Sequence, residues 1–213
     1  MNVKIKVPTS LKDIKLSQYQ KFLRTTKDNE DAEFINRQLV GIFCNLTDDL
    51  VFSMARKDFV NIVNDLSKVL QETPEVQTKF VYNGIKYGLI PSMEEMTVGE
   101  QADLDTIYSD YQKRDKVMSI LYRPIKLESR GSYLIVDYTG KEEPLDLSMD
   151  IVMGADVFFC NIVKDCMSIT LNYIKGAEIQ AKILPILEKS GIGIKTFTQS
   201  LEETFLSLKE QLN

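Results

Sequence analysis

The amino-acid sequence predicts a mainly α-helical fold with one small antiparallel β element, in which a helical core surrounds one long apolar helix. Over most of the chain, apolar residues recur every three or four positions, which is typical of helices that bury one face. Asn83 and Gly84 separate two β-prone runs, and this pair suits the type I′ turn of a hairpin. With 213 residues, 44% of them hydrophobic, the chain can bury a sizeable core.

At the N-terminus, apolar residues alternate with lysines over residues 3–7, which predicts a strand at a sheet edge that ends at Pro8. A short helix should follow, with Ser17 as its N-cap, and polar residues 25–31 should end it. We therefore expect residues 1–26 to form an N-terminal arm that is detachable from the rest.

Two amphipathic helices are expected next, the first from Asp31 to about Leu46 and the second over residues 55–71. The hairpin follows over residues 79–90. Thr97, three residues before Glu100, then forms a capping box that begins another helix.

The stretch of residues 113–126 predicts a further helix. That helix should end near Arg123, because Pro124 disfavours helical geometry in the residue before it. Residues 132–138 are a strand candidate. That strand could join either the first hairpin or the N-terminal strand in one small sheet.

The long apolar helix should begin near Ser148 and run to about Lys175, with Gly154 and Ala155 permitting close backbone approach. Its polar residues form one narrow stripe: Asn161, Asp165, Ser168, Asn172 and Lys175. We assign residues 27–192 to the helical core and residues 193–213 to a C-terminal amphipathic helix behind a glycine hinge. The apolar ridge of that last helix comprises Phe197, Leu201, Phe205, Leu208 and Leu212.

The composition excludes several classes of site. The chain has no histidine, which removes the usual general base and the commonest metal ligand. Cys44, Cys160 and Cys166 form no CxxC pair, which favours buried thiols in a reducing compartment. The start of the chain has no secretory signal pattern, and the long apolar run carries charges that disfavour a membrane span. We expect no catalytic, cofactor-binding or metal-binding residue.

Two groups of side chains have an alternative interpretation. The carboxylates Glu94, Glu95, Asp103 and Asp105 could gather a hard cation, although a solvated loop and a helix start explain them as well. Residues 111–126 mix tyrosines with Lys113, Arg114, Lys116, Arg123 and Lys126, the mixture of a nucleic-acid surface. The net charge of −5 favours a solvated helix face instead.

Four segments together suggest a family: "VPTSLKDIKLSQYQKFL", "NGIKYGLIPSMEEMTVGEQADLD", "MSILYRPI" and "LDLSMDIVMGADVFF". Their order resembles small proteins encoded among the head and tail genes of tailed bacteriophages, notably crAss-like phages and relatives that infect Bacteroidetes. It is similar, more loosely, to baseplate-hub and tail-assembly chaperone proteins. The resemblance reaches about Phe159 and brings no catalytic residue with it.

The resemblance implies a non-enzymatic, virion-associated structural or assembly protein, made in the host cytoplasm and placed in the portal–tail region or packaged as cargo. Its partners would be other phage structural proteins (portal, tail or cargo components) in a symmetric, multi-copy assembly, bound through the N-terminal arm, the C-terminal helix or both. Nucleic acid and membrane are not expected partners. Two alternatives stay open: a soluble tail-assembly chaperone absent from the mature virion, and a small nucleic-acid-binding regulator.

Overall fold

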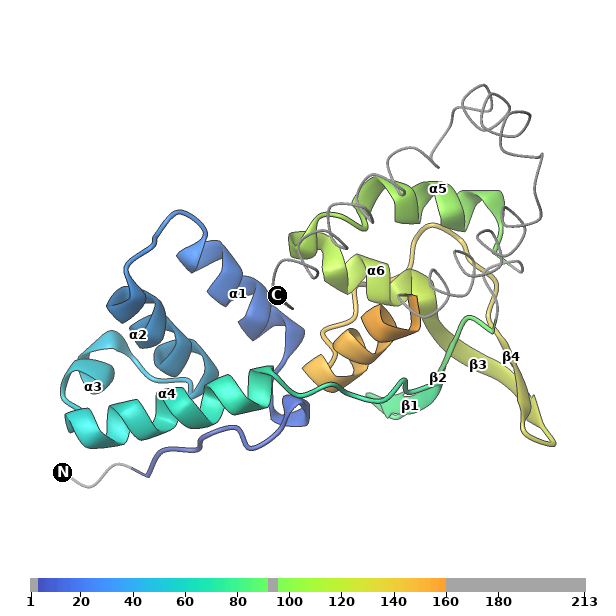
Figure 1. Ribbon diagram of the computed structural model, residues 1–213. Helices are drawn as coiled ribbons and strands as arrows, with labels where there is room; N and C mark the ends of the chain where they lie inside the picture. Colours follow the sequence, from blue (N-terminus) through green and yellow to red (C-terminus); the bar gives the residue numbers. More distant parts are fainter. Residues whose placement is uncertain (1–3, 92–95, 160–213) are drawn as a thin grey trace, which may run out of the picture. The chain divides into compact units, whose positions relative to one another are not determined.

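The computed structural model of the protein describes residues 4–91 and 96–159 (Figure 1). The chain divides into two units, Met1–Phe159 and Cys160–Asn213, and all described residues lie in the first. That unit combines α-helices with a four-stranded antiparallel sheet, which confirms the predicted α+β class.

The helical elements are η1 (Leu11–Asp13), α1 (Leu16–Thr26), α2 (Ala32–Phe43), α3 (Asp48–Phe52), α4 (Arg56–Leu70), α5 (Val98–Ile107), η3 (Tyr111–Lys113) and α6 (Arg114–Leu121). Residues 149–159 are also helical. The strands are β1 (Lys79–Tyr82), β2 (Ile85–Leu89), β3 (Tyr122–Ser129) and β4 (Ser132–Ile135).

Helices α1 to α4 pack together, and the two predicted amphipathic helices, α2 and α4, are confirmed (Figure 1). The Asp31 carboxylate caps α2 by accepting the amide hydrogen of Glu33 at 2.9 Å. The ring of Phe22 on α1 lies 5.5 Å from that of Phe43 on α2. The short helix α3 was not expected, since Asp48 and Asp49 indicated a break; they occupy its first turn, where acidic side chains favour the helix dipole.

The N-terminal strand prediction is wrong. Exposure does alternate along residues 4–7, where the lysines are exposed and the apolar side chains are half-buried. This segment nevertheless pairs with no described strand. The predicted cap at Ser17 is also wrong, because α1 begins at Leu16 and the side chain of Gln18 accepts the Lys15 amide hydrogen. Ser17 instead donates from its amide to Asp146, at 2.8 Å.

Residues 11–16 belong to the core of this unit. Leu11, Ile14 and Leu16 are buried. The amide of Leu16 donates to the carbonyl of Leu147 at 2.8 Å, and the amide of Met149 donates to the carbonyl of Ile14 at 2.9 Å. Detaching residues 1–26 would expose these three apolar side chains, which disfavours the docking role expected of an N-terminal arm.

The hairpin prediction is confirmed, with positive φ angles of 49° at Asn83 and 79° at Gly84. A second turn of the same kind, at Arg130 and Gly131, joins β3 to β4. The strand predicted over residues 132–138 lies in the same sheet but ends at Ile135. The strands lie in the order β1-β2-β3-β4. Helix α6 ends two residues earlier than expected and leads directly into β3, because the residue before Pro124 favours extended backbone (Figure 1).

The close backbone approach expected at Gly154 is confirmed, because a Cβ atom there would lie 2.7 Å from the carbonyl oxygen of Glu75. In the helix over residues 149–159, Val152, Ala155 and Phe159 are buried. The continuation of this helix as one long apolar helix, its polar stripe and the C-terminal amphipathic helix all lie outside the described residues.

Candidate functional site

The pairing of the strands divides the sheet into two faces. Phe80 and Tyr87 are cross-strand partners on one face, with ring centroids 5.7 Å apart. The Tyr133 ring lies on the opposite face, over Gly88, where an added Cβ atom would come within 2.4 Å of it. Because side chains alternate along a strand, Leu134 and its partner Leu127 lie on the face of Phe80 and Tyr87. We call this the apolar face.

The inner end of the apolar face, where β3 begins, is buried. Leu89 and Tyr122 are paired there, and both are buried in the core. The hydroxyl of Tyr122 donates to the carbonyl of Gln77 at 2.9 Å, and the side chain of Gln77 donates to Asp150 at 2.5 Å. These bonds tie the inner end to the helix over residues 149–159.

The outer end of the same face, beside the two turns, is open to solvent. Ile85 on β2, Leu127 on β3 and Leu134 on β4 are 49%, 60% and 62% exposed, respectively. We call these three side chains the outer apolar row. Single exposed apolar residues are normal on a protein surface, whereas several of them on one face of a sheet make that face a candidate interaction site. The sequence did not predict this row, because it did not predict the strand β3, which carries Leu127.

The opposite face of the sheet carries charge at both ends. At the inner end, Arg123 lies 2.5 Å from Glu100, whose side chain is 1% exposed. Near the outer end, Lys79 and Lys86 lie 2.9 Å and 2.6 Å from Glu128. Hydrogen bonds from Lys86 and then Lys79 lower the pKa of Glu128 to about 2. The ion pairs of Glu128 therefore lie on the face away from the outer apolar row.

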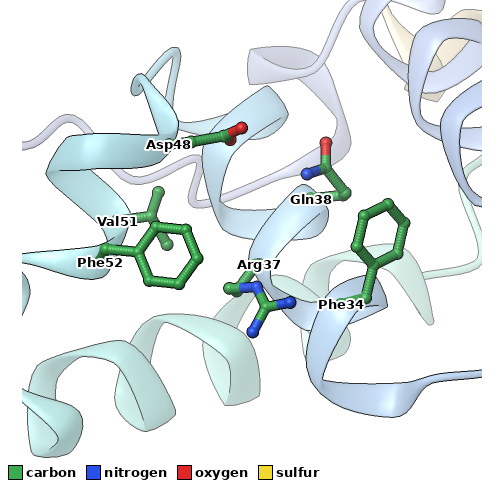
Figure 2. Close-up of a pocket in the computed structure, with 6 residues that line it drawn as sticks. All are labelled: Phe34, Arg37, Gln38, Asp48, Val51 and Phe52. Carbon is green, nitrogen blue, oxygen red and sulfur yellow. The ribbon is translucent and has the colours of Figure 1, made fainter.

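A small pocket lies between α2 and α3, with a volume of about 180 Å³ (Figure 2). Its lining residues are Phe34, Arg37, Gln38, Asp48, Val51 and Phe52. Figure 2 shows Phe34 and Phe52 on opposite sides, with Arg37 between them. The Arg37 guanidinium is 5.1 Å from the centroid of the Phe52 ring and 3.4 Å from the carboxylate of Glu33.

The structure separates the side chains of the basic, tyrosine-containing run. Arg114 and Arg123 are buried, while the three lysines of the run are exposed. Arg114 lies 4.5 Å and 4.7 Å from the rings of Tyr108 and Tyr111 and 3.4 Å from Asp156. Burial raises the pKa of the Asp156 carboxyl, while the nearby Arg114 opposes that rise. Both arginines thus serve buried ion pairs rather than a nucleic-acid surface.

Among the cysteines and the candidate cation-binding carboxylates, Cys44 and Asp103 have surroundings that suggest neither a reactive thiol nor a metal ligand. Cys44 is buried, and burial raises the pKa of its thiol to about 11, which keeps it protonated at neutral pH. Asp103 accepts a hydrogen bond from the hydroxyl of Tyr138 at 2.5 Å. Glu94, Glu95, Cys160 and Cys166 lie outside the described residues.

Three further findings bear on the kind of site. Within residues 4–91 and 96–159, no group of three histidine, cysteine, aspartate or glutamate side chains is placed to hold a metal ion. None of the helices described in that part of the chain has the length and apolar character needed to cross a bilayer. No protein-family model, curated protein or solved structure matches this chain significantly.

Proposed function

We propose that this chain is a non-enzymatic structural or assembly protein of a tailed-phage particle, and that it binds other structural proteins of that particle through the outer apolar row. The observation that carries the proposal is the exposure of Ile85, Leu127 and Leu134 on one face of three neighbouring strands. The resemblance of the sequence to tailed-phage virion proteins supplies the class of partner.

The row is built as a binding surface because its backbone is already ordered. Leu127 and Leu134 are cross-strand partners in the β3–β4 hairpin, and Ile85 is paired with Tyr82 in the β1–β2 hairpin. The backbone under all three side chains is thus held by strand pairing, so they need little further ordering when a partner arrives. Burying such a side chain from full exposure is worth roughly 1.5–3 kcal/mol. Because these three are 49%, 60% and 62% exposed, covering each one is worth about half of that before the cost of association. A partner that buried the row would therefore gain several kcal/mol.

Of the two alternatives, the regulator that binds nucleic acid has less support. Arg114 and Arg123 are buried in ion pairs, which leaves only the three lysines of the basic run to contact phosphates. A chaperone that leaves before maturation would use the same apolar row and differs only in its absence from the finished particle. The long apolar helix and the C-terminal amphipathic helix stay predictions, and a role of the latter in docking would be additional.

The test uses particles of a phage that encodes this chain, complemented with variants and analysed by quantitative mass spectrometry. We expect the wild-type chain in purified particles and the double variant Leu127→Ser/Leu134→Ser to be depleted at least tenfold while remaining folded. Val81→Ser is the matched control, because Val81 is 66% exposed on the opposite face of the sheet.

Two other outcomes would contradict the proposal, one for the docking surface and one for the presence of the chain in particles. Full incorporation of the double variant would remove the outer apolar row as the docking surface. A wild-type chain that binds tail proteins in the cell extract but is missing from particles would favour the chaperone.

A further inference from the structure

The pocket between α2 and α3 has the size of one side chain rather than of a small molecule. Sites for small molecules usually enclose roughly 300–1,000 Å³, whereas this pocket encloses about 180 Å³. Phe34, Val51 and Phe52 supply apolar walls. Phe52 is 68% exposed, so one wall stands at the surface and is accessible to a partner. A leucine, methionine or phenylalanine side chain fits this combination of size and lining.

The charges around the pocket favour a basic partner. Its one lining cation, Arg37, is already 3.4 Å from Glu33 and stacks on Phe52. Asp48 lines the pocket and Asp49 follows it, and neither has an ion-pair partner among the described residues. Because Glu33 already balances Arg37, the Asp48 carboxylate is the uncompensated charge of the pocket lining, and a neighbouring lysine or arginine on the partner would complement it.

We infer that this pocket is a second docking site, which takes one bulky apolar side chain of a partner protein segment flanked by basic residues. In such recognition, filling the pocket with one side chain supplies most of the binding free energy, and the charges at the rim determine which segments are selected. The site is separate from the outer apolar row, so it does not depend on that surface. Exposed charges at its rim make the binding weaken as salt rises.

The experiment selects mRNA-displayed random dodecapeptides on the immobilised full-length protein. We expect the enriched peptides to share one leucine, methionine or phenylalanine with lysine or arginine within three positions of it. Binding of these peptides should fall at least tenfold on Phe52→Ser, and Asp48→Lys should change the flanking preference from basic to acidic. Since Phe52 and Asp48 are exposed, neither variant should unfold the chain, and circular dichroism checks this directly.

Leu134→Ser is the matched control, because it removes an exposed leucine from the sheet and should leave peptide binding unchanged. Loss of binding on Leu134→Ser would place the site on the sheet, and retention on Phe52→Ser would exclude the pocket. Either result would overturn the inference. Enriched peptides without a basic preference would overturn its electrostatic part. If Phe52→Ser instead abolished self-association in sedimentation experiments, the pocket would hold a second copy of this chain, and the inference would be wrong.

Discussion

The inner and outer ends of the sheet carry the same kinds of side chains in opposite surroundings. At the inner end, Leu89 and Tyr122 are buried on the apolar face, and Glu100 and Arg123 are buried on the other. At the outer end, the apolar row and the Glu128 ion pairs are both accessible to solvent. The same chemistry should therefore stabilise the fold at one end and be available for binding at the other.

The largest effect is expected for Arg123→Met, which removes one partner of the buried ion pair. Glu100 would then stay buried without a counter-charge, and losing one partner of such a pair costs about 3–5 kcal/mol of the free energy of unfolding. Urea unfolding followed by circular dichroism measures the change. The double variant Glu100→Gln/Arg123→Met should recover part of the loss. Equal effects of Arg123→Met and Lys86→Met would mean that the two ends do not differ.

The second prediction compares one substitution at both ends of the apolar face. Leu89→Ala should lower the free energy of unfolding by about 2–5 kcal/mol, because it leaves a cavity in the core. Leu134→Ala should change it by no more than about 0.5 kcal/mol, since that side chain is largely in water. Thermal unfolding of both variants provides the measurement. A large loss for Leu134→Ala would show that the outer apolar row is part of the core.

Features of the sheet that depend on a few neighbouring residues could be predicted from the sequence, whereas those that depend on distant segments could not. The Asn83–Gly84 turn and the Thr97–Glu100 capping box are local patterns, and both were predicted correctly. The turn at Arg130 and Gly131 was missed, and with it the strand that carries Leu127. Pro124 indicated where α6 ends but not that β3 begins at once.

Long-range features lay beyond sequence patterns. Glu100 was predicted as a cap, yet its ion pair with Arg123 depends on how α5 meets the sheet. The Asp146 carboxylate that accepts from Ser17 comes from 129 residues further along the chain. The pocket between α2 and α3 depends on a helix that only the structure revealed. These contacts join segments whose separation no local periodicity encodes.

The third prediction concerns Gly88, which is paired with Arg123 near the inner end. Gly88→Ala should destabilise the fold by about 1–3 kcal/mol, because the new methyl group would come within 2.4 Å of the Tyr133 ring. Adding Tyr133→Leu should make the combined loss smaller than the sum of the two single losses, which a double-mutant cycle in urea would measure. Strict additivity would show that the ring and the glycine do not constrain each other.

The smallest effect is expected for Glu128→Gln at neutral pH, since the ion pairs of Glu128 with Lys79 and Lys86 lie at the surface. The pKa of Glu128 is lowered from 4.5 to about 2, so its stabilising contribution is present above pH 4.5 and is lost as the pH falls towards 2. A carbon-detected NMR titration should give a midpoint near 2 in the wild-type chain. In the variant Lys79→Met/Lys86→Met, the midpoint should return towards 4.5, because both hydrogen-bond donors are gone. A wild-type midpoint near 4.5 would show that the lysines do not hold this carboxylate, and the charged face of the outer end would then be no more ordered than any solvated surface.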